Sequence, residues 1–214
     1  MTHTSLIKTI IRSFSVAVLV CGLSVQARAE PITILALGDS LTAGYGLDPQ
    51  SAFPVKLETA LKAKGHDVVI INAGVSGDTA VQGAARLDWA LTPDVDAVII
   101  ELGANDALRG LDPAQAEAAL ASLLAKLKAK NLPVVLAGMR APPNLGAEYA
   151  AKFEGMYQRL SAGVLYYPFF LEGVVAVPKL NQADGLHPTG EGVDVIVAGM
   201  MPIVEQLLEQ AKAR

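Results

Sequence analysis

The sequence predicts an α/β protein in which helices cover both faces of a parallel sheet. Strand-like and helix-like segments alternate along the chain, which is the pattern of parallel strands joined by crossover helices. The strand-like segments are runs of Val, Ile, Leu and Ala without polar alternation, as in strands buried on both faces. The 214 residues suffice for one such domain, and no linker, internal repeat or low-complexity tract divides them.

Each element has its own local signal. Apolar runs predict five strands, at residues 33–37, 68–72, 97–102, 134–138 and 163–166. Apolar residues at helical spacing, such as Phe53, Leu57 and Leu61, predict helices in the intervals. Asp112 and Pro113 are typical of an N-cap and a first helical position. The expected helices are residues 51–64, 79–91, 112–130, 148–162 and 190–213.

The N-terminus has the pattern of a secretory signal peptide. Lys8 and Arg12 form a basic flank, residues 13–23 form an apolar stretch, and residues 27–29 (ARA) form a small-x-small cleavage site. The apolar stretch is shorter than the roughly 20 residues that span a bilayer. The sequence therefore predicts a signal peptide at 1–29, a single domain at 30–214, no stable membrane anchor, and a periplasmic or secreted protein.

Charge and cysteine content exclude several classes of function. Three of the 17 Lys and Arg residues lie in the leader, so residues 30–214 carry 14 of them against 21 Asp and Glu, a net charge of −7. An acidic chain without a basic run is a poor nucleic-acid binder. The only cysteine, Cys21, lies in the leader, and Val20 stands where lipoproteins carry a small residue before the lipidated cysteine. The mature domain then has no thiol for a disulfide, a nucleophile or a metal ligand.

Residues 38–41 (GDSL) follow directly on the first apolar run. Ligands of open parallel sheets bind at the carboxyl ends of the strands, so Ser40 is well placed for chemistry. An alternative is an ordinary polar turn, because Gly, Asp and Ser are common turn residues. Small and polar residues also follow the second and third strands, at 72–79 (NAGVSGDT) and 103–106 (GAND). These three loops are expected to meet at one edge of the sheet.

A serine nucleophile needs a base, normally histidine, and a third group that orients the base. His66 precedes the second strand, at the opposite edge of the sheet from Ser40, and is expected to be a surface loop residue. His187 precedes the last helix and can reach the active edge, so it is the candidate base. Asp184, three residues upstream, can orient the imidazole, although Asp-Gly-x-His-Pro is also compatible with a plain turn.

Hydrogen-bond donors for a developing oxyanion can come from three of these loops. The candidates are the backbone N–H groups of Ser40 and Gly74 and the side-chain amide of Asn105. Taken singly, Gly74 could be a tight turn and Asn105 a helix cap. Their joint occurrence beside Ser40 and the Asp184/His187 pair favours catalysis.

Four blocks resemble the SGNH (GDSL) hydrolase superfamily, and within it the bacterial periplasmic arylesterase, acyl-CoA thioesterase and lysophospholipase group. They are GDSLTAGYG at 38–46, GAND at 103–106, RAPPNLG at 140–146 and DGLHP at 184–188. The resemblance runs from about Ile32 to the C-terminus and assigns the four named residues to Ser40, Gly74, Asn105 and His187, with Asp184 as the acid. It implies a flavodoxin-like three-layer α/β/α sandwich with a five-stranded parallel sheet, and ester or thioester hydrolysis without metal or cofactor. Ala104 departs from relatives that carry a second glycine there.

Other catalytic motifs do not fit. The Gly-x-Ser-x-Gly elbow of α/β-hydrolases is broken at Ser40 by Thr42 and at Ser76 by Gly77. The Gly44-Tyr45-Gly46 segment lacks the third glycine of a dinucleotide-binding loop. Two histidines and no cysteine in the mature domain do not form a zinc-site pattern.

Apolar loops near the active edge favour substrates with acyl or aryl groups. They are residues 108–111, 139–146, 166–171 and 174–177, and each buried methylene would contribute about 0.8 kcal/mol. The aromatic residues at 166–170 could equally be core. The leading hypothesis is therefore a serine esterase acting on esters or thioesters, including lysophospholipids. The alternatives are a carbohydrate O-deacetylase with the same triad and a non-catalytic flavodoxin-like binding module.

Overall fold

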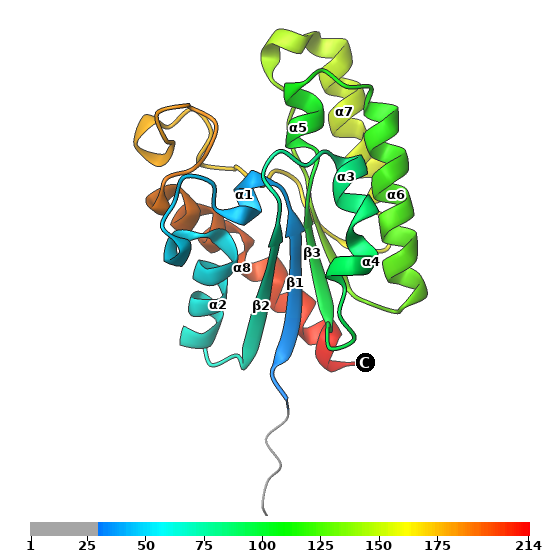
Figure 1. The fold of residues 1–214 in the computed structure, drawn as a ribbon, viewed down its shortest axis with the longest axis vertical. Helices are drawn as coiled ribbons and strands as arrows, with labels where there is room; N and C mark the ends of the chain where they lie inside the picture. The colour runs from blue at the N-terminus through cyan, green and yellow to red at the C-terminus, as the bar shows by residue number, and fades with distance from the viewer. Residues whose placement is uncertain (1–29) are drawn as a thin grey trace, which may run out of the picture.

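The computed structural model describes residues 30–214, so the predicted signal peptide lies outside the described residues. Five strands form one sheet in the order β2-β1-β3-β4-β5, and every neighbouring pair is parallel (Figure 1). The strands are β1 Ile32–Gly38, β2 Val68–Gly74, β3 Ala97–Glu101, β4 Val134–Ala137 and β5 Leu165–Tyr167. The predicted five-stranded parallel sheet is confirmed, and its order is that of the flavodoxin-like fold.

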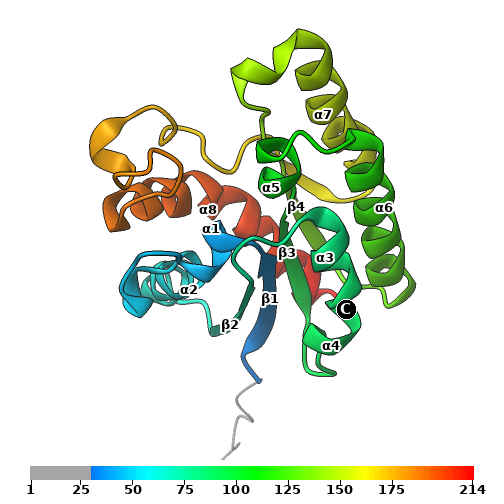
Figure 2. The same cartoon turned by 45° about the horizontal axis from the view of Figure 1, so that its top comes forward.

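Helices cover both faces of the sheet, which gives the three-layer sandwich (Figures 1 and 2). One layer contains α2 and α8, which pack against each other, and the other contains α3, α4, α6 and α7. Within residues 30–214, no helix is both long and apolar enough to cross a membrane. The helices are α1 Ser40–Ala43, α2 Phe53–Ala63, α3 Ala80–Ala85, α4 Leu87–Ala90, α5 Ala104–Leu108, α6 Pro113–Ala129, α7 Gly146–Leu160 and α8 Gly190–Lys212, with 3-10 turns at Pro49–Ser51, Pro143–Leu145 and Pro178–Leu180.

The helix expected at 79–91 is a misprediction, because the structure has two short helices there. Thr79 caps α3 with a reciprocal Thr79–Gln82 capping box, as its sequence position allows. Backbone geometry changes at Arg86 (φ −98°, ψ 1°), whose side chain turns toward the ends of β1 and β2 instead of continuing a solvent-facing helical surface. Two further short helices, α1 and α5, begin directly after β1 and β3, where only loops were expected.

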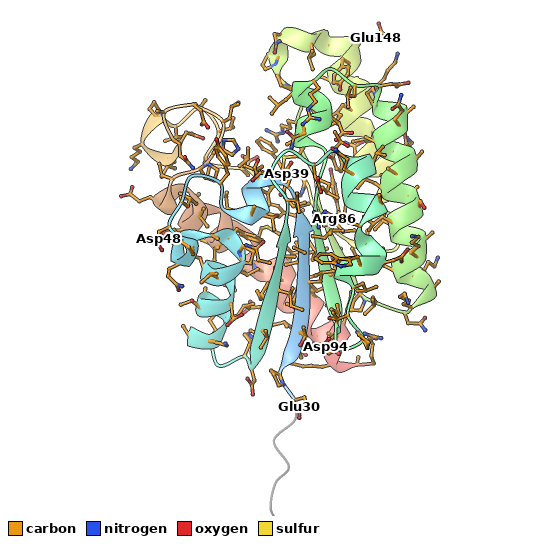
Figure 3. All side chains as sticks on the ribbon, viewed as in Figure 1. Glu30, Asp39, Asp48, Arg86, Asp94 and Glu148 are labelled. Atoms are coloured by element: carbon orange, nitrogen blue, oxygen red, sulfur yellow. The ribbon has the colours of Figure 1, made fainter. Side chains whose placement is uncertain are left out.

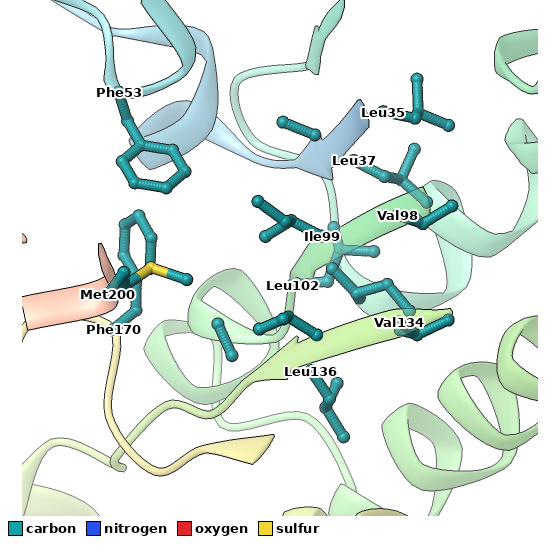
Figure 4. Close-up of a cluster of buried hydrophobic side chains, with 14 of the residues drawn as sticks. Leu35, Leu37, Phe53, Val98, Ile99, Leu102, Val134, Leu136, Phe170 and Met200 are labelled. Atoms are coloured by element: carbon teal, nitrogen blue, oxygen red, sulfur yellow. The ribbon is translucent and has the colours of Figure 1, made fainter. Parts of the chain in front are cut away.

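The core explains why the strands are apolar throughout. Leu35, Leu37 and Ile99 on adjacent strands are at most 1% exposed, because helices cover both faces of the sheet (Figure 4). On the α2/α8 side, Phe53 and Phe170 meet edge to face with ring centroids 5.0 Å apart. Burying each side chain of this size contributes about 1.5–3 kcal/mol to the hydrophobic free energy of folding.

The order of the strands determines which edge of the sheet is expected to bind a ligand. β1 lies between β2 and β3, and the chain leaves β1 toward α2 on one face but leaves β3 toward α6 on the other. Diverging connections of this kind open a crevice at the carboxyl ends of the two strands, which is the usual ligand site of such sheets. Gly38, the last residue of β1, is aligned with Gly74 of β2 and with Glu101 of β3.

Candidate active site

Ser40 is the first residue of α1, immediately beyond β1. Asp39 is the N-cap and accepts the N–H of Leu41 at 3.0 Å, while Gly44 ends the helix in the left-handed region at φ 83°. The turn before Ser40 requires glycine, because a Cβ at Gly38 would lie only 2.0 Å from Thr42 Oγ1. This tight strand-to-helix turn holds the Ser40 side chain at the crevice.

The structure brings the three candidate triad residues together, because Ser40, His187 and Asp184 form one hydrogen-bonded series. His187 Nε2 lies 2.9 Å from Ser40 Oγ, and His187 Nδ1 lies 2.6 Å from Asp184 Oδ2. The other oxygen of Asp184 accepts the backbone N–H groups of Leu186 and His187, at 2.9 and 3.0 Å. The backbone hydrogen bond from His187 is the largest cause that lowers the pKa of Asp184, to about 2, so this carboxyl group is ionised at neutral pH.

Several contacts hold the segment that carries His187. The Gln182 side chain donates to the carbonyls of Tyr45 and Pro188, at 2.8 and 3.0 Å, which ties the segment to the loop after α1. The Tyr45 ring packs on the imidazole with ring centroids 4.6 Å apart. Together these contacts fix the imidazole beside Ser40 across a separation of 147 residues in the chain.

His66 has no part in this arrangement. It lies two residues before β2, at the opposite end of the sheet, and its Nε2 lies 3.5 Å from Glu205 Oε1 on α8. Its side chain is only 22% exposed, so it is more buried than the surface loop position expected from the sequence. Its position at the end of the sheet opposite Ser40 is the one expected from the sequence.

The three predicted oxyanion donors differ in their hydrogen bonding. The N–H of Ser40 has no acceptor among residues 30–214. The Asn105 amide lies at the crevice, where its Nδ2 donates to Asp39 Oδ2 at 3.1 Å and to the Asp78 carbonyl at 3.0 Å. The N–H of Gly74 donates to Asn72 Oδ1 at 2.9 Å. The structure thus leaves the Ser40 donor free, while Asn105 and Gly74 have acceptors within the protein.

Gly74 has a clear packing role. A Cβ at this position would lie 2.2 Å from the backbone nitrogen of Ala43 and 2.6 Å from its Cα. Glycine therefore allows the end of β2 to pack directly against α1, which carries Ser40.

An apolar cavity of about 430 Å³ opens beside Ser40, His187 and Asn105. Most of its lining is apolar, and all four predicted apolar loops contribute to it. Examples are Leu108, Met139, Ala141, Phe169 and Val175. The aromatic residues at 166–170 were expected either to line the substrate site or to belong to the core, and both occur. Phe169 lines the cavity, whereas Phe170 is fully buried in the core.

Residues 36–195 match the model of the GDSL-like lipase/acylhydrolase family. The chain belongs to this family. It is 40% identical to Esterase TesA of Pseudomonas aeruginosa over 189 residues, which cover 87% of this chain and 93% of that protein. It is 41% identical to an arylesterase of Vibrio mimicus over 186 residues, with coverage of 85% and 91%.

A third similar protein is named for three activities. Thioesterase 1/protease 1/lysophospholipase L1 of Escherichia coli is 37% identical over 179 residues, covering 82% of this chain and 85% of that one. A crystal structure of TesA matches the fold with a TM-score of 0.78 at 39% identity, covering 82% of this chain and 99% of the other. The SGNH (GDSL) resemblance noted in the sequence is thus confirmed.

Arg86 joins the active edge of this GDSL-family hydrolase in a way that the sequence pattern did not reveal. Its guanidinium donates to the carbonyls of Gly38 and Ala73, both at 2.8 Å, and pairs with Asp78 at 2.6 Å. Figure 3 labels Asp39 and Arg86 near the carboxyl end of β1. One side chain therefore binds the ends of β1 and β2 and the loop that reaches Asn105. In the sequence, Arg86 was a single arginine within a predicted helix, and nothing there indicated these contacts.

Within residues 30–214, no group of three or more His, Cys, Asp or Glu side chains is arranged to hold a metal ion. Two acidic side chains nevertheless lie buried directly behind Ser40. Asp39 and Glu101 are both fully buried, and neither was predicted as a site residue. Asp39 lay in the GDSL motif, and Glu101 was the next-to-last residue of the strand predicted at 97–102, but neither pattern indicated that the two meet.

Proposed function

We propose that this carboxylic ester hydrolase works through an acyl-enzyme formed on Ser40. The observation that carries the proposal is the hydrogen-bonded series from Ser40 through His187 to Asp184, at 2.9 and 2.6 Å. In the first step, Ser40 Oγ attacks the acyl carbonyl carbon and His187 Nε2 accepts the hydroxyl proton. The ionised Asp184 keeps the other ring proton on Nδ1 and stabilises the imidazolium that forms.

The carbonyl oxygen becomes an anion in this step and needs donors. The free N–H of Ser40 can bind it without losing another hydrogen bond. We assign further donors to Asn105 and Gly74. On substrate binding, the Asn105 amide would give up the Asp78 carbonyl and keep its hydrogen bond to Asp39, and the N–H of Gly74 would exchange Asn72 Oδ1 for the substrate oxygen. One such donor is typically worth about 100- to 1000-fold in rate.

The second half of the reaction reverses the proton transfers. His187 donates its proton to the departing alcohol or thiol, and the acyl group stays on Ser40. A water molecule then gives a proton to His187 and attacks the acyl carbon. The bond from the acyl carbon to Ser40 Oγ breaks, His187 returns the proton to Oγ, and the carboxylic acid leaves.

The cavity supports a substrate with an apolar acyl or aryl group. Each methylene that enters it should stabilise the transition state by about 0.8 kcal/mol, which is about a fourfold gain in kcat/KM. We therefore expect kcat/KM for p-nitrophenyl esters to rise stepwise from acetate until the cavity is filled. Steady-state assays with esters and matched acyl thioesters measure this, and a flat or falling series would contradict it.

A matched pair of variants locates the acyl site. Leu108 lines the cavity and is 49% exposed, and Val81 on α3 is also 49% exposed but lies outside it. Leu108→Asp should reduce the preference for longer esters and leave acetate hydrolysis nearly unchanged. Val81→Asp should leave both unchanged. An acetylated polysaccharide in the same assay tests the O-deacetylase alternative, which predicts faster release of acetate from the glycan than from any longer ester.

We also propose export of the domain from the cytoplasm. The proposal rests on the basic and apolar pattern of residues 1–29 and the small residues at 27 and 29. N-terminal sequencing of the protein recovered from the periplasm or medium should begin at Glu30. Recovery of the intact chain from the cytoplasm alone would contradict export.

A further inference from the structure

Glu101 is an unusual residue for the end of a buried strand. It is fully buried, and its Oε2 accepts the Thr42 hydroxyl at 2.8 Å and the N–H of Asp39 at 3.3 Å. Its other oxygen, Oε1, is buried with no hydrogen-bond donor among residues 30–214. A carboxylate oxygen buried without a donor is strongly unfavourable, so Glu101 in this place is expected to be neutral.

Asp39 is the acidic neighbour of Glu101, and the two carboxyl groups differ in their surroundings. Asp39 accepts the N–H of Leu41 through Oδ1 and the Asn105 amide through Oδ2. These donors stabilise a negative charge on Asp39, and the proximity of His187 adds to that effect. Glu101 also accepts two hydrogen bonds, but both go to Oε2, so Oε1 has no donor, and Glu101 faces the charge of Asp39. The charge therefore belongs on Asp39 and the proton on Glu101.

The direction of the pKa shifts agrees with this assignment. Burial raises the pKa of Asp39 to about 6, and its hydrogen bonds limit the rise. Burial, followed by the charge of Asp39, raises the pKa of Glu101 well above its usual range. A hydrogen bond between the two side chains lowers the pKa of Asp39 and raises that of Glu101, as expected of two carboxyl groups that share one proton.

We propose that protonated Glu101 is a positioning residue for the reaction: it donates a hydrogen bond to the Asp39 carboxylate, which in turn holds both the Ser40 turn and the Asn105 amide. Glu101 touches no substrate atom in this arrangement and acts only through Asp39. The inference rests on the proposed function, because it assigns Ser40 and Asn105 their roles in the acyl transfer. It adds a buried proton that the reaction needs but does not consume.

The arrangement couples two loops of the site through a single anion. Asp39 Oδ1 fixes the first turn of α1, and Asp39 Oδ2 orients the amide that we assign to the oxyanion. Without the proton on Glu101, two facing carboxylates would repel each other in a buried space, and the Asp39 side chain would move. A displacement of about 1 Å at a reacting group can cost on the order of 100-fold in rate.

Two variants distinguish a role of Glu101 as a neutral hydrogen-bond donor from a role in packing alone. Gln has the same length, is always neutral, and can accept from Thr42 and Asp39 N–H while donating to the Asp39 carboxylate. Glu101→Gln should therefore keep kcat within about threefold of wild type. Leu fills similar space but cannot donate, so Glu101→Leu should lower kcat for a p-nitrophenyl ester by about 100-fold with little change in KM. Thermal unfolding and near-UV circular dichroism of both variants report the fold.

The outcomes decide the proposal in each case. A Glu101→Gln variant that is inactive or unfolded would overturn it, because a charged carboxylate would then be required. A folded Glu101→Leu variant with wild-type kcat would also overturn it, because Glu101 would then be packing alone. If Glu101→Leu does not fold, the activity of Glu101→Gln still decides. Fluorophosphonate labelling of the wild-type protein is run in parallel. If Ser40 is not labelled, the proposed function fails, whatever the Glu101 variants show.

Discussion

Replacing Ser40 with alanine should lower kcat/KM for p-nitrophenyl esters by roughly 10⁴- to 10⁶-fold. The variant removes the only nucleophile in the proposed mechanism but keeps the backbone N–H that binds the oxyanion. Among residues 30–214, Ser40 Oγ hydrogen-bonds only to His187, so the free energy of unfolding should change by less than about 1 kcal/mol. Steady-state kinetics and urea unfolding measure the two effects.

Ser76 provides the matched control for Ser40. It is an exposed serine in the loop after β2, at the same edge of the sheet, and no hydrogen bond joins it to a histidine among the described residues. Ser76→Ala should retain wild-type activity. An active Ser40→Ala variant, or a loss confined to Ser76→Ala, would remove Ser40 from the mechanism.

Replacing His187 with alanine should cost about as much as replacing Ser40, because a triad acts as a unit. Asp184→Asn should cost less, on the order of 10⁴-fold in kcat. The asparagine oxygen can still accept the N–H groups of Leu186 and His187, but its amide would then face Nδ1 as a donor. That contact favours a proton on Nε2, where the imidazole cannot accept the proton of Ser40.

His66→Ala is the control for the histidine variants. His66 contacts Glu205 at the far end of the sheet, so this variant should keep full activity with at most a small loss of stability. Equal kcat values for Asp184→Asn and wild type would show that the acid does not set the tautomer. A greater loss for Asp184→Asn than for His187→Ala would contradict the assigned roles.

Much of the fold was predictable because its signals are local. Buried parallel strands produce uninterrupted apolar runs, and Asp112 and Pro113 marked the start of α6 correctly. Boundaries were less predictable where tertiary contacts decide them. The Arg86 side chain binds the ends of β1 and β2, and the helix expected through this residue is broken there. Nothing in the local sequence indicates that contact.

In the active site, too, some features were predictable from the sequence and others depend on tertiary contacts. Ser40, Asp184 and His187 could be paired from the sequence, because His66 and His187 were the only histidines outside the leader and only one could reach the active edge. The partners of Asn105 could not be predicted, because they depend on the positions of Asp39 and the Asp78 carbonyl in space. The Asp39–Glu101 pair was hidden for the same reason. A glutamate at a strand end gives no sign of whether it is exposed or buried.

Labelling with a fluorophosphonate tests the central claim most directly, because only a serine activated by a neighbouring base reacts quickly with such a probe. Intact-mass spectrometry of the wild-type protein should show one probe per molecule, and peptide mapping should place it on Ser40. The Ser40→Ala and His187→Ala variants should remain unlabelled over the same time. A wild-type protein that stays unlabelled, or that carries the probe on a residue other than Ser40, would contradict the account.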